Sequence, residues 1–315
     1  MRKQVSGIHH ITAIVGHPQE NVDFYAGVLG LRLVKTTVNF DDPGTYHFYF
    51  GNENGKPGTL ITFFPWARGR KGEIGDGQVG ITTYVIPTGA LAFWQERLTK
   101  LNVSYEIIER FGEKYLQFSD PHGLKLELVE REEGENSQWE FAGITADKAI
   151  KGFGGAVLFS SNPAATGKLL TDVFGFEQVA AEGDFIRYRS PADLGNIIDI
   201  KQTPIGHLGR MGVGTVHHIA LRAQDDEDLA AWQDELFASG FRTTTFRDRH
   251  YFKSIYFREH GAILFEMATD PPGFMVDESF EELGTGLKLP PQYEPVRDQI
   301  ESVLLPFEVR EPNID

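Results

Sequence analysis

The sequence predicts an α+β protein made of four copies of one unit. Each unit consists of a strand, a helix and three further strands. Three observations support this prediction. A histidine doublet inside an apolar, β-branched segment occurs twice, in residues 8–14 (IHHITAI) and 216–222 (VHHIALR). Each doublet precedes a helical stretch that ends at a glycine, Gly30 or Gly240, and glycine suits the left-handed residue that follows many helices. Two fainter copies of the same order of elements lie between these segments.

The first and fourth units can be followed element by element. Pro18 and Asp225 are residue types favoured at helix starts, and a β-branched run typical of a strand follows each glycine. The predicted elements are strand 7–14, helix 18–29 and strand 31–38 in the first unit, and strand 215–222, helix 225–239 and strand 241–246 in the fourth.

The second and third units have the same order with weaker signatures. We expect strand 79–85, helix 89–101 and strands ending at 124–128 in the second unit, and strand 154–159, helix 164–174 and strands ending at 197–200 in the third. The polar stretch 131–152 is typical of an interdomain connection. The predicted domains are therefore residues 7–132 and 152–270, followed by a C-terminal tail at 271–315.

The composition of the 315-residue chain excludes several classes of partner and site. A formal net charge of −15 argues against nucleic-acid and anionic membrane partners, because both would repel the protein. No run of about 18 apolar residues is present, and the first residues lack the apolar core of a secretion signal, so a cytoplasmic protein is expected. The sequence leaves the oligomeric state open, a homo-oligomer included. The chain has no cysteine, so only histidine, aspartate or glutamate could hold a metal.

The histidine doublets are the strongest candidates for metal ligands, because they occur at equivalent positions of the repeat. Side chains alternate between the two faces of a strand, so the members of a doublet should point to opposite faces. In the fourth unit the face of the first histidine is otherwise apolar and should pack in the core. His10 and His218 are therefore predicted to be ligands, and His9 and His217 to support them or contact substrate.

A third ligand is expected from a carboxylate on a strand that can reach both histidines. Glu266 lies in the apolar strand 263–268, where an unpaired carboxylate would be costly. Glu127 and Lys125 instead alternate with leucines, a pattern typical of a strand with one solvated face. We therefore select Glu266. No metal is expected in the second and third units, whose residues at the histidine positions are Gly80, Ile81, Gly155 and Ala156.

Two histidines and one carboxylate leave three coordination positions open, which is the usual arrangement in non-haem Fe(II) oxygenases. An aromatic phenolate and O2 could then bind the same ion, and the metal would carry the difficult redox chemistry. Mn(II) uses similar ligands, so the sequence does not separate it from Fe(II).

The four βαβββ units with their histidine doublets resemble the vicinal oxygen chelate superfamily, which includes extradiol ring-cleaving dioxygenases, glyoxalase I and bleomycin-resistance proteins. The resemblance covers residues 7–270, and the segments 63–66 (FFPW) and 286–291 (GLKLPP) are similar to ring-cleaving dioxygenases that act on hydroquinones. The resemblance implies four βαβββ modules arranged in two pseudo-symmetric halves. In each half a curved mixed sheet would form an open cup, the kind of cup that surrounds the metal in this superfamily. A metal site shared by the first and fourth units is also a property of the hydroquinone-cleaving branch.

The same resemblance implies roles for residues around the metal. Tyr256 matches the family's acid/base tyrosine, and Arg249 matches a substrate-contacting arginine of the hydroquinone branch. From the residues alone, Arg249 is equally consistent with a solvated loop charge. His250 is a candidate proton shuttle, and Thr12 could either bond a substrate hydroxyl or pack in its strand.

The leading interpretation is an Fe(II)-dependent, extradiol-type ring-cleaving dioxygenase. It would insert O2 into a small aromatic substrate, a hydroquinone or a catechol, in aromatic degradation or detoxification. One alternative is a glyoxalase-like lyase or isomerase with Zn(II) or Ni(II), but this chemistry normally needs a further carboxylate, and strand 60–64 of the first unit has none. The other alternative is a non-catalytic protein that binds an aromatic drug, which would not need the three ligands.

Overall fold

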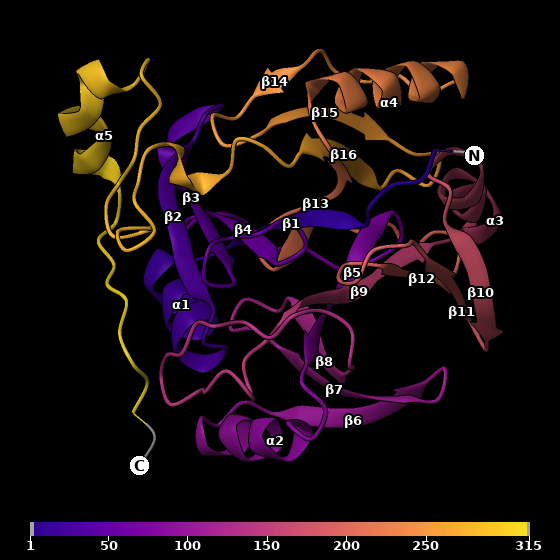
Figure 1. Ribbon diagram of the computed structural model, residues 1–315, viewed down its shortest axis with the longest axis horizontal. Coiled ribbons are helices and arrows are strands. Elements are labelled where there is room, and N and C mark those ends of the chain that lie inside the picture. Colours follow the sequence, from indigo (N-terminus) through magenta and orange to yellow (C-terminus); the bar gives the residue numbers. More distant parts are fainter. Residues whose placement is uncertain (1–2, 314–315) are drawn as a thin grey trace.

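In the computed structural model, which describes residues 3–313, the chain folds into two curved eight-stranded sheets with few helices (Figure 1). The predicted α+β class and the pair of pseudo-symmetric mixed sheets are confirmed. None of the described helices is long and apolar enough to cross a membrane.

The elements follow the predicted order of strand, helix and strands, and two of the helices continue as π-helical segments (η1 and η2). The first unit contains β1 (Ile8–Val15), α1 (Pro18–Val22), η1 (Asp23–Val28), β2 (Arg32–Asn39), β3 (Asp42–Gly51) and β4 (Leu60–Pro65). The second contains β5 (Gln78–Ile86), α2 (Leu91–Lys100), β6 (Tyr105–Arg110), β7 (Glu113–Ser119) and β8 (Lys125–Glu130). The third contains β9 (Gly152–Ser160), α3 (Pro163–Lys168), η2 (Leu169–Val173), β10 (Glu177–Glu182), β11 (Phe185–Arg189) and β12 (Ile197–Gln202). The fourth contains β13 (Thr215–Ala223), α4 (Asp226–Ala238), β14 (Arg247–Asp248), β15 (Lys253–Arg258) and β16 (Leu264–Thr269), and the tail contains η3 (Phe274–Val276), η4 (Glu294–Val296) and α5 (Arg297–Val303).

Each sheet joins two units that belong to different halves of the sequence. The first sheet has the order β14-β15-β16-β13-β1-β4-β3-β2, so the indigo first unit lies beside the orange fourth unit in Figure 1. The second sheet has the order β10-β11-β12-β9-β5-β8-β7-β6. The central pairs, β1 with β13 and β5 with β9, are antiparallel. The domain boundaries at 132 and 152 stay a prediction from the sequence.

A β-bulge interrupts each central strand at the same place in the repeat. The pairing register skips His9 on β1 and His217 on β13 in the first sheet, and Gly80 on β5 and Gly154 on β9 in the second. A bulge leaves one extra residue unpaired and re-aims the side chains next to it. The histidine doublets therefore do not follow the simple alternation of a regular strand.

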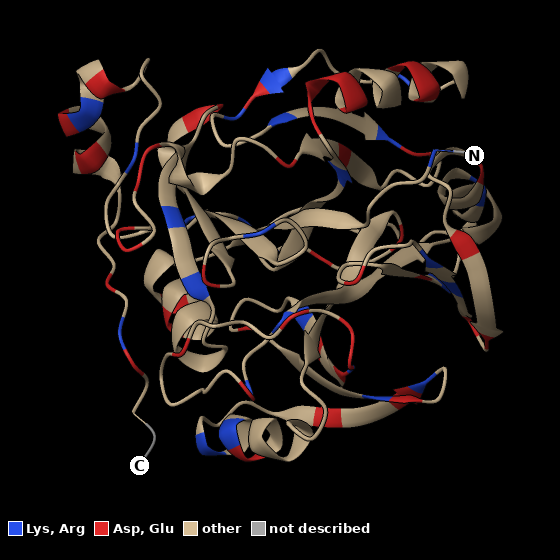
Figure 2. Ribbon diagram, viewed as in Figure 1, with Lys and Arg blue, Asp and Glu red and all other residues tan. Residues whose placement is uncertain are grey.

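One apolar core connects the two sheets and the helices that cover them. The helix α4 contributes Leu229, Trp232 and Leu236, whose spacing places them on one helix face, and it begins after Asp225, whose side chain accepts a hydrogen bond from a backbone amide of the first turn. Figure 2 marks acidic residues along this helix in red. α4 is therefore amphipathic, with its apolar face on the core and its charged residues outside.

The C-terminal tail packs against the first sheet. Phe274 and Leu283 of the tail belong to the apolar cluster that contains Tyr49 and Ala268 of that sheet. Lys35 of β2 is fully buried and pairs with the carboxylates of two tail residues, Asp277 and Glu278. The helix α5 lies beside β2 and β3 (Figure 1). The tail thus closes one side of the sheet that carries both histidine doublets.

The predicted strand 241–246 is wrong, because these residues are irregular and the edge strand is the short β14. The Thr244 amide donates a backbone hydrogen bond to the Tyr256 carbonyl, and side-chain hydrogen bonds supplement it in place of a regular ladder. The Thr244 hydroxyl accepts a hydrogen bond from the Tyr256 amide, and the Gln233 side chain donates to the Thr244 carbonyl. Threonine-rich runs can therefore look like strands in sequence while their hydroxyl groups compete with the ladder.

Candidate metal centre

His10, His218 and Glu266 converge at the middle of the first sheet. The Nε2 atoms of the two histidines are 3.2 Å apart. Oε2 of Glu266 lies 3.1 Å from Nε2 of His10 and 2.7 Å from Nε2 of His218. All three residues are buried, and among residues 3–313 they are the only group of histidine, aspartate and glutamate side chains placed to share a metal ion. The structure brings together the three residues that the sequence selects.

The three donor atoms fit a metal ion in spacing, and Glu266 and His218 also fit one in protonation. Bonds of about 2.1 Å would place neighbouring ligand atoms of an octahedral ion about 3 Å apart, close to the separations observed. Burial alone would raise the pKa of Glu266, but His10 and His218 hold that pKa well below its ordinary value. Burial lowers the pKa of His218. Metals bind the carboxylate form of glutamate and the neutral form of histidine, which are the forms that these pKa shifts favour.

The first histidine of each doublet contacts the second. Because of the bulges, Nδ1 of His9 lies 2.9 Å from Nδ1 of His10, and Nδ1 of His217 lies 2.8 Å from Nδ1 of His218. The other ring nitrogen of His9 lies 3.2 Å from the Thr269 carbonyl oxygen. A hydrogen bond to the far nitrogen of a metal-binding histidine fixes its tautomer and ring orientation. His9 and His217 are therefore placed to orient the two candidate ligands.

A cavity of about 380 Å³ opens beside these donors, and His10 and His218 form part of its wall. This volume lies within the range of small-molecule sites. Phe40, Phe64 and Phe252 contribute aromatic surface to the wall, which suits an aromatic ligand.

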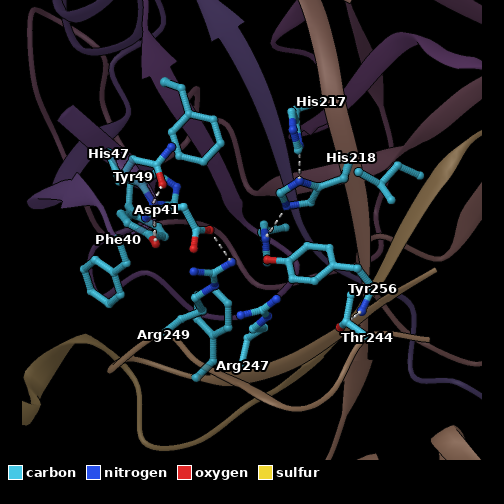
Figure 3. A pocket seen from close by; sticks show the side chains of 15 residues that line it. Phe40, Asp41, His47, Tyr49, His217, His218, Thr244, Arg247, Arg249 and Tyr256 are labelled. Carbon is cyan, nitrogen blue, oxygen red and sulfur yellow. Dashed lines mark hydrogen bonds and ion pairs between the residues drawn. The ribbon is translucent and has the colours of Figure 1, made fainter. Parts of the chain in front are cut away.

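Tyr256 and Arg249 both face this cavity (Figure 3). Tyr256 pairs with Glu266 across β15 and β16, and its ring centroid is 5.4 Å from that of His218. Burial, and then the charge of Glu266, raises the pKa of Tyr256, so its hydroxyl stays protonated. The Arg249 guanidinium lies 5.7 Å from the Tyr256 ring centroid and pairs with Asp41 at 3.0 Å. Arg249 is therefore a residue of the cavity wall rather than a solvated loop charge.

Thr12 and His250, which the sequence made candidates for substrate contact and proton transfer, do not form part of the cavity wall. The Thr12 hydroxyl is buried and lies 2.7 Å from the hydroxyl of Thr62 on β4. His250 has a φ of 68°, and its ring lies 3.5 Å from Asp277 of the tail. A role for His250 as a proton shuttle therefore has no support from its position.

His47 and Tyr49 on β3, which no sequence motif singles out, also line the cavity (Figure 3). The Tyr49 hydroxyl lies 2.9 Å from Nδ1 of His47. Burial lowers the pKa of His47 well below its ordinary value and raises that of Tyr49 well above it. The alternation in residues 46–50 (YHFYF) shows that the two side chains share a face. Only the pairing of β3 with β4 shows that this is the face of the metal centre.

The corresponding place in the second sheet holds an ion-pair network. The strand registers make Glu127 and Asp199 the counterparts of the metal-centre carboxylate, with Ile81 and Gly155 at the histidine positions. Arg110 bridges the two carboxylates, with 2.9 Å contacts to each. Glu127 is fully buried, so its interpretation as part of a solvated face is wrong. A guanidinium group lies here between two carboxylates, where the first sheet has two imidazoles and one carboxylate.

Comparisons with known proteins found close relatives. The model of the Glyoxalase/Bleomycin resistance protein/Dioxygenase superfamily matches residues 7–128 and 152–277. A Bacillus subtilis protein named "Putative ring-cleaving dioxygenase MhqO" is 67% identical over 311 residues, which cover 99% of each chain. The "Chlorohydroquinone/hydroquinone 1,2-dioxygenase" of Sphingobium indicum is 36% identical over 309 residues, 95% of each chain. A crystal structure of a "putative dioxygenase" from Bacillus subtilis matches with a TM-score of 0.97 and 67% identity, covering 99% of this chain and 100% of that one.

Proposed function

The chain belongs to the glyoxalase/bleomycin resistance protein/dioxygenase superfamily, and we propose that it is a ring-cleaving dioxygenase of the extradiol type. In this proposal it inserts O2 into a hydroquinone or a catechol, with Fe(II) held by His10, His218 and Glu266. The observation that carries the proposal is the buried donor set of two histidines and one glutamate, whose two histidines form part of the wall of an aromatic-lined cavity. The names of the relatives from Bacillus subtilis and Sphingobium indicum support the reaction class.

The donor set supports Fe(II), with Mn(II) as the second candidate. Three protein ligands leave coordination positions free, and this set of two histidines and one carboxylate suits an oxygen-activating metal. A redox-active ion bound there would supply the electron transfer between an aromatic ring and dioxygen that amino-acid side chains do not provide.

The side chains of the cavity wall would bind and orient the substrate. The protonated hydroxyl of Tyr256, next to Glu266, is placed to donate a hydrogen bond to a substrate oxygen beside the histidines. The positive charge of Arg249 would stabilise negative charge on that oxygen. Phe64 and Phe252 would pack against the ring and exclude water from it.

The glyoxalase-like alternative has less support from this site. Thr62 occupies the first-unit position that corresponds to Glu266, because it pairs with Tyr49 as Glu266 pairs with Tyr256. A threonine hydroxyl cannot replace the further carboxylate that glyoxalase chemistry normally needs. A protein that only binds aromatic drugs would have no use for the three convergent donors.

Oxygen uptake tests the proposal. The protein would be loaded with Fe(II) without oxygen and then supplied with O2 and either hydroquinone, catechol or the hemithioacetal of methylglyoxal and glutathione. We expect one O2 consumed per ring cleaved with at least one diol, and none with the hemithioacetal. Zn(II)-loaded protein is the matched control and should consume no O2. Conversion of the hemithioacetal without oxygen uptake with any diol would support a glyoxalase and contradict the proposal.

A further inference from the structure

Strand pairing makes Tyr49 the first-unit counterpart of Tyr256. Tyr256 on β15 pairs with Glu266 on β16, and Tyr49 on β3 pairs with Thr62 on β4. β15 and β3 each lie two strands away from the central pair of the sheet, on opposite sides of it. The cavity is thus bordered by two tyrosines from opposite flanks of the metal centre (Figure 3).

Tyr49 differs from its counterpart in the groups that it contacts. Its hydroxyl lies 2.9 Å from Nδ1 of His47, and Nε2 of His47 lies 2.8 Å from the Thr62 hydroxyl. The Thr62 hydroxyl lies 2.7 Å from that of Thr12, on the strand that carries His10. These four side chains form a hydrogen-bonded chain that begins on the central strand β1 and ends at the cavity wall.

This chain of side chains carries no net charge. Burial lowers the pKa of His47 and raises that of Tyr49, so the imidazole and the phenol are both neutral. A neutral imidazole has one N–H, and either ring nitrogen can carry it. In one tautomer Tyr49 donates to His47 and can accept a hydrogen bond from a ligand. In the other tautomer His47 donates to Tyr49, and the phenolic O–H is free for a ligand.

The ring of Tyr49 is held firmly in place. Its centroid lies 5.0 Å from that of Phe274 and 6.5 Å from that of Phe252, and the residue is almost fully buried. The hydroxyl therefore has a set position, and only its hydrogen-bond direction can change. A preorganised polar group of this kind gives selectivity, because leaving it without a partner is costly.

We propose that the Tyr49 hydroxyl, oriented by His47, binds the second oxygen of the substrate and favours diols whose hydroxyl groups are at opposite ends of the ring. This inference rests on the proposed dioxygenase function. When one oxygen of a hydroquinone lies beside His10 and His218, its second oxygen points away from them and needs a partner on the cavity wall. A catechol directs both of its adjacent oxygens toward the histidines, so it gains nothing from Tyr49.

Binding in the absence of oxygen tests this assignment with two ligands of similar shape. In 4-methylphenol a methyl group replaces the second hydroxyl of hydroquinone, so the ratio of the two dissociation constants reports the contact of that hydroxyl. Titration of the Fe(II)-loaded protein should show hydroquinone binding about tenfold more tightly. In Tyr49→Phe the ratio should fall close to one.

Two other tyrosine variants serve as controls. Tyr46→Phe removes a hydroxyl from the same strand outside the cavity and should keep the tenfold ratio. Tyr256→Phe should weaken both ligands equally, because its contact is with the oxygen that they share. The role of Tyr49 would be contradicted if Tyr49→Phe kept the ratio of the two dissociation constants, or if the unaltered protein bound both ligands equally. If hydroquinone still supported oxygen uptake in that case, the proposed dioxygenase function would stand. If the unaltered protein binds neither ligand and consumes no O2 with any diol, the proposed function fails as well.

Discussion

His9 and His10 are identical side chains at adjacent positions of β1, and the bulge at His9 decides which of them reaches Glu266. The bulge leaves His10 in the ladder and directs its Nε2 toward the carboxylate, while His9 contacts the opposite ring nitrogen. β13 repeats this arrangement with its own doublet. The second histidine of each doublet is thus placed to bind a metal, and the first histidine is placed to orient the ring of the second.

Replacing His9 with phenylalanine should weaken metal binding without abolishing it. His9→Phe keeps an aromatic ring in the buried position but removes the partner of the His10 Nδ1 atom, and such losses typically cost about 10- to 100-fold in metal affinity. Competition with a chelator measures this affinity. His10→Phe should lose the metal altogether, and His207→Phe, on an exposed loop, should change nothing. Equal losses in His9→Phe and His10→Phe would mean that the roles are assigned wrongly.

Removing the Tyr256 hydroxyl should separate catalysis from metal binding. Tyr256→Phe keeps the ring beside His218 and deletes one donor, so we expect full metal content and turnover slower by about 10²-fold or more. Metal content, melting temperature and oxygen uptake would be measured on one preparation. Normal turnover of the metal-loaded variant would show that the hydroxyl has only a structural role.

The sequence was sufficient to select His10, His218 and Glu266, because the histidine doublets occupy equivalent positions of the repeat and Glu266 is an isolated carboxylate in the apolar strand 263–268. It was not sufficient for His47 and Tyr49. Nothing near them in sequence shows which face of β3 meets the metal centre, and that depends on the pairing of β3 with β4.

At the scale of elements, periodicity predicted the central strands and the helices, but it could not show the bulges. A bulge depends on the registers of two strands that are far apart in the chain, such as β1 and β13. Contacts between distant strands also explain why the sequence pattern around Glu127 indicated a solvated face. Its alternation with leucines is real, but Arg110 and Asp199 cover the polar face of that strand from β6 and β12.

The ion pairs of the second sheet should make stability depend on pH. Burial alone would raise the pKa of Glu113 on β7, but Arg131 and Arg187 lower it to about 2. A carboxylate with a lowered pKa stabilises the fold above its unfolded value of about 4.3, and this contribution is lost as the pH falls toward the folded value. Glu113→Gln should therefore have a lower melting temperature than the unaltered protein at pH 7. This difference in melting temperature should shrink as the pH is lowered from about 4.3 to 2.

Thermal melts at several pH values measure this difference. Glu109→Gln, at an exposed position of the neighbouring strand β6, is the control and should show no pH-dependent difference. If the difference in melting temperature between Glu113→Gln and the unaltered protein stayed constant down to pH 2, the charge of the Glu113 carboxylate would not be what stabilises the network.

At the scale of the whole molecule, carboxylates at equivalent positions of the two sheets have different partners. In the first sheet Glu266 faces two histidines, and in the second Glu127 faces Arg110. The pairing of the first unit with the fourth is what joins His10 to a partner histidine more than half a chain away. The sequence repeat indicated the four units, but the sheets they form were expected from the family resemblance rather than from any local pattern.

Metal content of two matched variants tests the central claim most directly. Glu266→Gln and Glu127→Gln each replace a buried carboxylate with an amide of the same shape, and the amide can still accept hydrogen bonds from a neighbour such as Arg110. We predict one metal ion per chain in the unaltered protein and in Glu127→Gln. Glu266→Gln should have a strongly reduced metal content and no oxygen uptake, with its fold intact by circular dichroism. Full metal occupancy in Glu266→Gln, or loss of the metal in a folded Glu127→Gln, would contradict the assignment of the metal centre.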